Sequence, residues 1–170
     1  MLVNLSDVLS EQHKTIDETV RVEMSRCKMS HGMFPIINKE PVHIVVEHVK
    51  GKELLIKADT RLTLRIPCDR CLEEVDQELE LNVFKHVDLS VTDAELTEEL
   101  DESNFIDGYN LDVDQLLYNE ILTGWPTKVL CSEECKGICS VCGHNLNEGF
   151  CGCEDTGLDP RMSVIRDMFK

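Results

Sequence analysis

The sequence predicts an α+β fold in which an antiparallel β-sheet meander carries a few helices and a small C-terminal cysteine cluster. Three observations lead to this fold class. Hydrophobic and polar residues alternate in several segments, as half-buried strands require. The connections are short and each strand has one polar face, whereas a parallel sheet needs long helical crossovers and is coated on both faces. Eight of the nine cysteines in the 170 residues form four close pairs, which is typical of metal ligands.

The strands follow from the period-two pattern along the chain. The clearest run is Glu53–Ile66, and a second alternating run, Val75–Val87, is expected to pair with it. Residues Ile16–Met24 suggest an earlier strand. A further strand is predicted at Val42–Val49, with the chain turning near Gly51 directly into the long strand.

An acid-rich stretch and a helix follow the sheet. The 42 residues His86–Thr127 contain eleven acidic residues and no Lys or Arg, so they carry most of the formal net charge of -16. Residues 88–108 are predicted to form an acidic excursion from the sheet, followed by a helix over 113–123. Asp112 suits the helix N-cap, and Gly124 with the nearby Pro126 ends the helix.

The chain is expected to form one sheet domain over residues 1–130 and a cysteine-rich segment over 131–170 that packs on the same domain. A closing helix is predicted from Asp159 and Pro160, with Met162, Ile165 and Phe169 returning to the core. The acidic N-terminal residues predict no export or membrane segment, and so a cytoplasmic location in which thiols stay reduced.

The eight paired cysteines fit two structural zinc ions, because such an ion takes four ligands in a tetrahedron. One set is compact, with the spacing C-x2-C, eight residues, C-x-C; the other is paired by elimination and joins a strand end to a segment sixty residues later. The sets are Cys139, Cys142, Cys151 and Cys153, and Cys68, Cys71, Cys131 and Cys135. Four thiolates leave no open position on a metal, so no enzyme is predicted.

Three alternatives to these zinc sites stay open. The cysteines can be reduced buried thiols, Cys68 and Cys71 can form a redox C-x-x-C pair, or His144 can replace one cysteine in a mixed site. Cys27 is interpreted as a small thiol outside the sites.

The charged residues suggest two kinds of partner. A row of cations on the outer sheet face is either solvated or contacts RNA phosphates: Lys57, Arg61 and Arg65, with Arg70 beyond. The acidic excursion is either a soluble loop or recognises a basic protein through Asp93, Glu95, Glu98, Glu99, Asp101 and Glu102. The net charge favours a basic partner, and no motif for a small-molecule substrate is present.

Three runs carry a resemblance to a known family: Leu64-Arg-Ile-Pro-Cys-Asp-Arg-Cys-Leu72, the segment Cys131–Asn147, and Asp159-Pro-Arg161. Together they resemble the YceD family of large ribosomal RNA subunit accumulation proteins over nearly the whole chain. The resemblance implies a bacterial or plastid protein needed for normal levels of large-subunit ribosomal RNA, with a ribosomal protein or a large-subunit precursor as partner. Because some relatives lack the last cysteine set, it also implies that the second metal is dispensable for the shared function.

Overall fold

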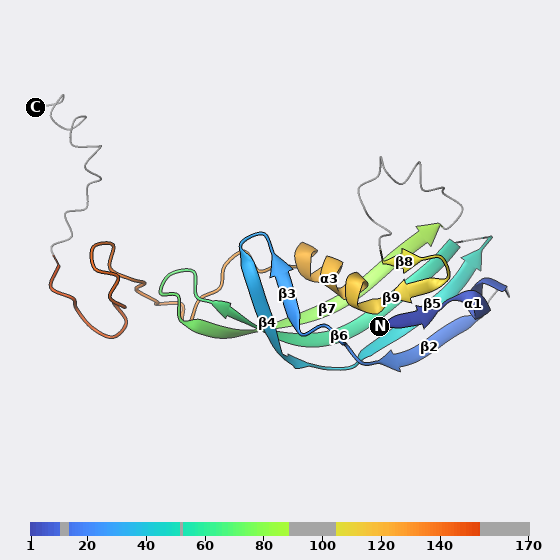
Figure 1. The fold of residues 1–170 in the computed structure, drawn as a ribbon, viewed down its shortest axis with the longest axis horizontal. Helices are drawn as coiled ribbons and strands as arrows, with labels where there is room; N and C mark the ends of the chain where they lie inside the picture. Colours follow the sequence, from blue (N-terminus) through green and yellow to red (C-terminus); the bar gives the residue numbers. More distant parts are fainter. Residues whose placement is uncertain (11–13, 52, 89–104, 154–170) are drawn as a thin grey trace, which may run out of the picture. The chain divides into compact units, whose positions relative to one another are not determined.

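The computed structural model describes residues 1–10, 14–51, 53–88 and 105–153. Within them the chain consists mostly of antiparallel β-sheet with two short helices, which confirms the predicted fold class (Figure 1). The chain divides into two compact units, residues 1–66 with 75–129 and residues 67–74 with 130–170. The second unit resumes at Leu130, one residue before the predicted start of the cysteine-rich segment. Residues 67–74, expected in the sheet domain, belong instead to the second unit, because their two cysteines group with Cys131 and Cys135.

The first unit contains a six-stranded antiparallel sheet. Strands β2, β5, β6, β4 and β3 are hydrogen-bonded in that order, and β7 pairs with β6. Along the chain the strands are β2 (Thr15–Val20), β3 (Arg26–Met29), β4 (Gly32–Lys39), β5 (Val42–Lys50), β6 (Glu53–Pro67) and β7 (Glu74–Asp88). Strands β5, β6 and β7 form the predicted meander, and Gly51 in the β5–β6 turn has a positive φ of 64°.

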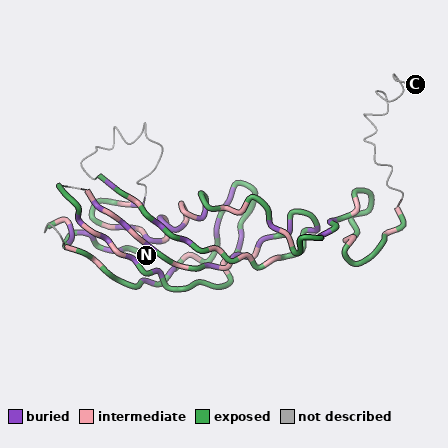
Figure 2. The backbone as a smooth tube through the Cα atoms, turned by 180° about the vertical axis from the view of Figure 1, so that it is seen from behind, coloured by how far each residue is buried: buried purple, intermediate pink, exposed green. Residues whose placement is uncertain are grey.

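Buried residues alternate with more exposed ones along the strands of this sheet, so one face is buried (Figure 2). Ile44 and Val46 of β5 and Ile56 and Leu64 of β6 are fully buried. They belong to one hydrophobic cluster that also contains the buried side of helix α3 (Val113–Thr123). The strict alternation of β6 is therefore explained by a sheet with a helix on one face only.

Helix α3 begins and ends where the sequence predicts. The Asp112 side chain accepts hydrogen bonds from the backbone N–H groups of Asp114 and Gln115, which satisfies two donors of the first turn. The Gly124 N–H donates to the Glu120 carbonyl at the other end. Leu117 and Ile121 on the apolar stripe are fully buried. No helix among the described residues is long and apolar enough to cross a bilayer.

The strand predicted at Ile16–Met24 is too long, because β2 ends at Val20. The backbone N–H groups of Glu23 and Met24 instead donate to Oδ1 of Asp114, each over 3.1 Å. These amides therefore bond to the first turn of α3 and cannot continue a strand ladder.

Several short elements lie outside the predictions. Strands β3 and β4 form a hairpin, and β1 (Leu2–Asn4), β9 (Asn110–Asp112) and β8 (Ile106–Asp107) form a three-stranded sheet beside α1 (Ser6–Ser10). The end of the predicted acidic excursion is wrong, because Phe105 is 1% exposed and β8 follows it. Residues 89–104 and the predicted closing helix over 159–169 lie outside the described residues.

Candidate metal centres

The second unit brings together the two predicted sets of cysteines. Within each set, all four Sγ atoms lie within 4.8 Å of one another. The first cluster consists of Cys68, Cys71, Cys131 and Cys135, and the second cluster of Cys139, Cys142, Cys151 and Cys153. Both clusters can hold a metal ion.

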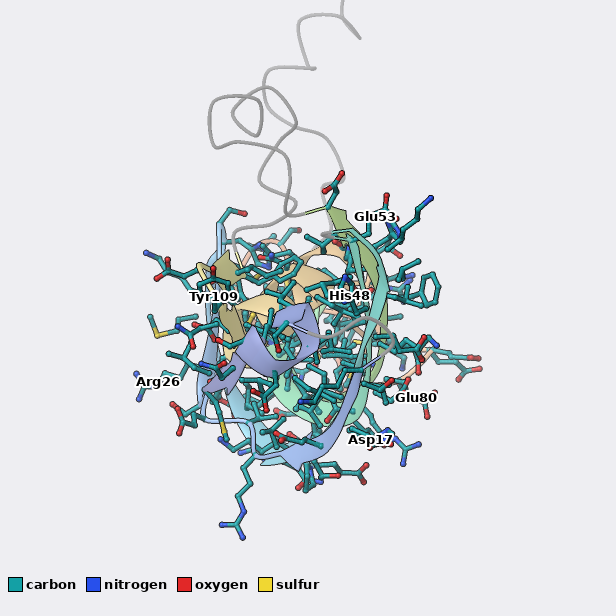
Figure 3. All side chains as sticks on the ribbon, turned by 90° about the vertical axis from the view of Figure 1, so that its right-hand side faces the viewer. Asp17, Arg26, His48, Glu53, Glu80 and Tyr109 are labelled. Atoms are coloured by element: carbon teal, nitrogen blue, oxygen red, sulfur yellow. The ribbon has the colours of Figure 1, made fainter. Side chains whose placement is uncertain are left out.

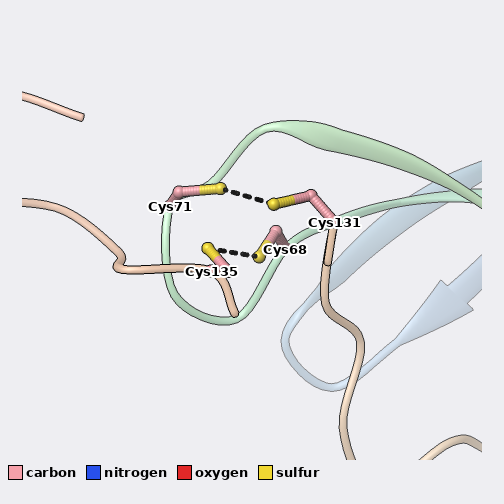
Figure 4. A group of neighbouring side chains, drawn as sticks. All are labelled: Cys68, Cys71, Cys131 and Cys135. Atoms are coloured by element: carbon pink, nitrogen blue, oxygen red, sulfur yellow. Dashed lines mark hydrogen bonds between the residues drawn. The ribbon is translucent and has the colours of Figure 1, made fainter. Parts of the chain in front are cut away.

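The sulfur spacing in the first cluster fits one tetrahedral ion (Figure 4). The Sγ atoms of Cys68 and Cys135 are 3.8 Å apart, and those of Cys71 and Cys131 are 3.5 Å apart. Four sulfurs at the usual zinc–sulfur distance of about 2.3 Å form a tetrahedron with edges of about 3.8 Å. A disulfide needs about 2.05 Å, so these pairs are free thiols poised around a common centre.

The first arm of this cluster is a tight turn over residues 67–74. The Leu72 N–H donates to the Cys68 carbonyl over 3.0 Å, and the Cys68 N–H donates to the Glu73 carbonyl over 2.7 Å. This closed turn directs the sulfurs of Cys68 and Cys71 to one side. Leu72 has a positive φ of 65°, an uncommon conformation for a residue with a side chain.

Arg70 connects this turn to the second arm. Its Nη1 donates to the Cys135 carbonyl over 2.7 Å, and its own carbonyl accepts the N–H of Ile138 over 3.2 Å. Gly137 has a φ of 79°, and a Cβ atom there would lie 3.1 Å from the Arg70 carbonyl oxygen. Glycine is therefore required at residue 137 for both its backbone conformation and this close approach.

The second cluster repeats the same turn. The Gly143 N–H donates to the Cys139 carbonyl over 2.9 Å with a φ of 74°, and the Val141 N–H donates to the Cys139 sulfur over 3.4 Å. The backbone carbonyl of His144 accepts the Cys139 N–H. The cluster itself contains only cysteine sulfurs, so His144 contributes to the turn through its backbone and not as a metal ligand.

Cys68 in the first cluster and Cys139 in the second are readily ionised. Burial raises the pKa of Cys68, but hydrogen bonds from the backbone N–H groups of Cys71 and Arg70 outweigh burial and bring the pKa to about 6. The pKa of Cys139 is likewise about 6, chiefly because the backbone N–H groups of Cys142 and Val141 stabilise its thiolate. Each cluster therefore offers at least one thiolate near neutral pH without help from a metal.

Cys71, Cys131 and Cys153 resist ionisation because several sulfurs share a small volume. In contrast, the hydrogen bond from the Asn147 side chain lowers the pKa of Cys135. A backbone hydrogen bond at Glu73 lowers the pKa of Cys71, but burial and the other three sulfurs raise it to about 12. The sulfurs of Cys142 and Cys151 raise the pKa of Cys153 to about 12. A bound cation is needed to keep four thiolates together, which is the chemistry of a metal centre.

The predicted cationic row is paired with carboxylates across the sheet. Lys57 Nζ lies 3.1 Å from Glu47 Oε1, Arg61 Nη2 lies 2.6 Å from Glu80 Oε1, and Arg65 Nε lies 2.7 Å from Asp76 Oδ1. Glu80 projects from the outer side of the sheet, where the charged rows of β6 and β7 meet (Figure 3). The row is thus part of a cross-strand charge ladder and presents little excess positive charge.

The other residues that the sequence singled out lie outside both the cationic row on β6 and the two clusters' ligand sets. Arg70 belongs to the second unit, where it bonds to Cys135 as described. The six acidic residues of the predicted partner site, between Asp93 and Glu102, lie outside the described residues. Cys27 is fully buried in β3, and burial raises the pKa of its thiol. It belongs to neither cluster.

The spacing of the cysteines did not reveal the polar side chains that join the two clusters. Asn147 Nδ2 donates to the Cys135 sulfur over 3.3 Å, and Asn145 Nδ2 donates to Glu73 Oε1 over 2.9 Å. Both asparagines come from the loop between Cys142 and Cys151. Their position between two ligands of the second cluster is the one signal in the sequence that points to them.

The comparison with known protein families covers both clusters. The model of the family described as large ribosomal RNA subunit accumulation protein YceD matches residues 56–169. No curated protein and no solved structure matches the chain. The family match spans more than half of the 170 residues and includes every paired cysteine. The chain therefore belongs to the YceD family.

Proposed function

We propose that this protein is a non-enzymatic, zinc-braced accessory factor that supports the accumulation of large-subunit ribosomal RNA by binding a basic ribosomal protein or a precursor particle. The family match is compatible with a role in ribosomal RNA accumulation. The observation that carries the proposal for the partner is the charge balance. The described cations on the outer face of β6 are already paired with carboxylates, while the chain as a whole has a formal charge of -16. Such a field attracts a basic partner and repels phosphate.

Zinc is the ion that the donor set favours. Four thiolates with tetrahedral spacing are the usual ligand set of structural zinc, and they leave no position for water or substrate. In this proposal the ions brace the fold and the protein acts in the cytoplasm, and the unbridged thiols support both points. Native mass spectrometry of the purified chain is expected to find two zinc ions per chain. A coloured protein that carries iron and sulfide, or a disulfide-bonded metal-free chain, would contradict this.

The proposed partner site is tested by neutralising charge without shortening the chain. One variant changes the six acidic residues to amides: Asp93, Glu95, Glu98, Glu99, Asp101 and Glu102. A matched control neutralises six exposed acids elsewhere: Glu18, Asp59, Asp107, Glu133, Glu134 and Glu148. Both variants lose the same formal charge, so a difference between them reports the local site and not the net charge.

The measurement is retention of ribosomal proteins and precursor particles on the immobilised protein as salt is raised. We expect the first variant to lose its partner at lower salt than the control, because clustered charge is screened as ionic strength increases. Equal retention by both variants would remove the role of the acidic residues. Loss of large-subunit ribosomal RNA in cells that carry only the first variant would connect the contact to function.

Direct RNA binding through Lys57, Arg61, Arg65 and Arg70 is the second candidate. It is favoured if reversal of these four charges releases RNA while the folded structure persists.

A thiol-redox role for Cys68 and Cys71 is a third candidate. The low pKa of Cys68 is in its favour, but Cys68 is fully buried, and a reactive thiol must be reachable. Two tightly held zinc ions would exclude a redox role for Cys68 and Cys71.

A further inference from the structure

A side chain from the loop of the second cluster contacts the first cluster. Asn147 is a residue of the loop between Cys142 and Cys151, and yet its side chain reaches a sulfur of the first cluster. Its Nδ2 atom lies 3.3 Å from the Cys135 Sγ. A hydrogen bond to a ligand sulfur spreads the charge of the thiolate and orients the sulfur toward the ion. Asn147 therefore contacts a ligand of the first cluster with its side chain, while its backbone belongs to the loop of the second cluster.

The amide of Asn147 is held in the orientation that this contact needs. Its Oδ1 accepts the backbone N–H of Lys136 over 2.8 Å, and its own backbone N–H donates to Asn145 Oδ1 over 3.0 Å. Because the oxygen faces a donor, the nitrogen must face the sulfur. The side chain is positioned by the chain on both sides of it.

The loop between Cys142 and Cys151 also contacts the first arm of the first cluster. Asn145 Nδ2 donates to Glu73 Oε1 over 2.9 Å, and Glu73 supplies the carbonyl that accepts the Cys68 N–H. The other Glu73 oxygen, Oε2, lies 3.7 Å from the Cys71 sulfur. Asn145 thereby occupies one oxygen of a carboxylate that stands beside a ligand thiol.

The backbone pairs this loop with the segment between the clusters. Ile138 and Asn145 form an antiparallel bridge, and the Leu146 N–H donates to the Gly137 carbonyl over 2.9 Å. The ends of the loop are Cys142 and Cys151, two sulfurs of the second cluster. A metal bound there closes the loop, and its conformational entropy is then lost before Asn147 and Asn145 engage the first cluster.

From this arrangement we infer that Asn147 is a positioning residue for Cys135, a ligand of the first metal site, although Asn147 itself lies in the loop of the second site. We infer that the two sites therefore bind metal cooperatively. Loading of the second cluster orders the loop that stabilises Cys135 and Glu73, and this raises the affinity of the first cluster. Linkage requires that loading of the first cluster raise the affinity of the second by the same factor. This inference rests on the proposed zinc loading, and it adds a coupling that two independent structural sites lack.

The test measures zinc affinity of the first cluster by competition with a chromophoric chelator. A variant with Cys151→Ser and Cys153→Ser disables the second cluster, and Asn147→Ala removes the connecting side chain. Each is expected to lower first-site affinity about tenfold or more, the usual cost of a lost outer-shell partner. With all three substitutions together, the loss should be no greater than with the two serines alone, because both routes remove the same contact.

Two further variants test the coupling if the variant with the two serines fails to fold. Asn147→Asp preserves size and the acceptor for the Lys136 N–H but removes the donor to sulfur, so it should also weaken the first site. Glu148→Ala alters a neighbouring exposed side chain of the same loop and should change nothing. With Co²⁺ as the probe, loss of the hydrogen bond to Cys135 should move the sulfur-to-cobalt absorption to lower energy, an effect that a general loosening of the loop does not produce.

The outcomes separate the coupling from the metal loading. A parent chain that binds two zinc ions, with first-site affinity indifferent to the serine pair and to Asn147→Ala, overturns the coupling alone. Fully additive losses in the combined variant overturn it as well. A parent chain that takes up no zinc overturns the zinc proposal and the coupling with it.

Discussion

Leu72 and Gly143 occupy the same position in the two C-x2-C turns. Each follows the second cysteine, and each donates its N–H to the carbonyl of the first cysteine, over 3.0 Å to Cys68 and 2.9 Å to Cys139. Both have a positive φ, 65° at Leu72 and 74° at Gly143. Glycine adopts this conformation freely, whereas leucine does so at a cost of about 1 kcal/mol. The first turn therefore stores backbone strain that the second avoids.

This difference predicts opposite effects from exchanging the residue types. Leu72 is 63% exposed, so Leu72→Gly sacrifices little packing and should slow metal release from the first cluster, by about fivefold for about 1 kcal/mol. Gly143→Ala should speed release from the second cluster, since open space surrounds a Cβ there and only the backbone conformation is penalised. Chelator-release kinetics measure both. Faster release from Leu72→Gly would show that the turn is not strained.

The helix over the sheet provides a test of the core. Leu117 of α3 is fully buried, and Leu117→Ala should lower the free energy of unfolding by about 2–5 kcal/mol. Leu122 on the same helix is 45% exposed, and Leu122→Ala should cost less than about 1 kcal/mol. Denaturant unfolding can be followed by fluorescence of Trp125, the single tryptophan, whose ring centroid lies 5.2 Å from that of Phe34. Equal costs for the two variants would place α3 away from the core.

The ion pair of Arg65 and Asp76 predicts a dependence of stability on pH. The Arg65 side chain donates to both carboxylate oxygens, over 2.7 and 3.1 Å, and this lowers the pKa of Asp76 below its ordinary value of 3.8. A carboxyl whose pKa is lower in the folded state stabilises the fold above the unfolded value and loses that contribution as the pH falls through the folded value. The stability difference between the parent chain and Asp76→Asn should therefore be constant near neutral pH and diminish below about pH 4. A difference that grows on acidification would contradict this sign.

Metal retention should fall steeply with pH. In the first cluster the pKa values of Cys71 and Cys131 are raised, so both thiols are protonated at neutral pH without metal and must lose a proton when it binds. Two such protons make the affinity fall about 100-fold for each unit of pH decrease. Zinc competition between pH 6 and pH 8 measures the slope, and Cys27→Ala serves as a control that should leave it unchanged. A slope near zero would mean that the sulfurs are not the ligands.

The long strands could be predicted from the sequence because each pattern is local. Alternation in Glu53–Ile66 and Val75–Val87 requires only that one face be buried, whichever elements cover it. The β3–β4 hairpin escaped prediction because Pro35 lies within it, and a proline weakens the signal of a strand. The end of β2 escaped prediction because the partner of Glu23 and Met24 is a carboxylate about ninety residues away.

The sequence by itself determined the fold class, the α3 helix with its cap and the compact cysteine set, since periodicity, capping and ligand spacing are properties of neighbouring residues. The second cysteine set was predicted only by elimination, and the tertiary structure brings its four sulfurs together. Only the tertiary structure decided that the cations of β6 are paired with carboxylates and that Asn147 of one cluster's loop bonds to a sulfur of the other. These relationships depend on which segments meet in space, and no local pattern specifies where the chain folds back to meet itself.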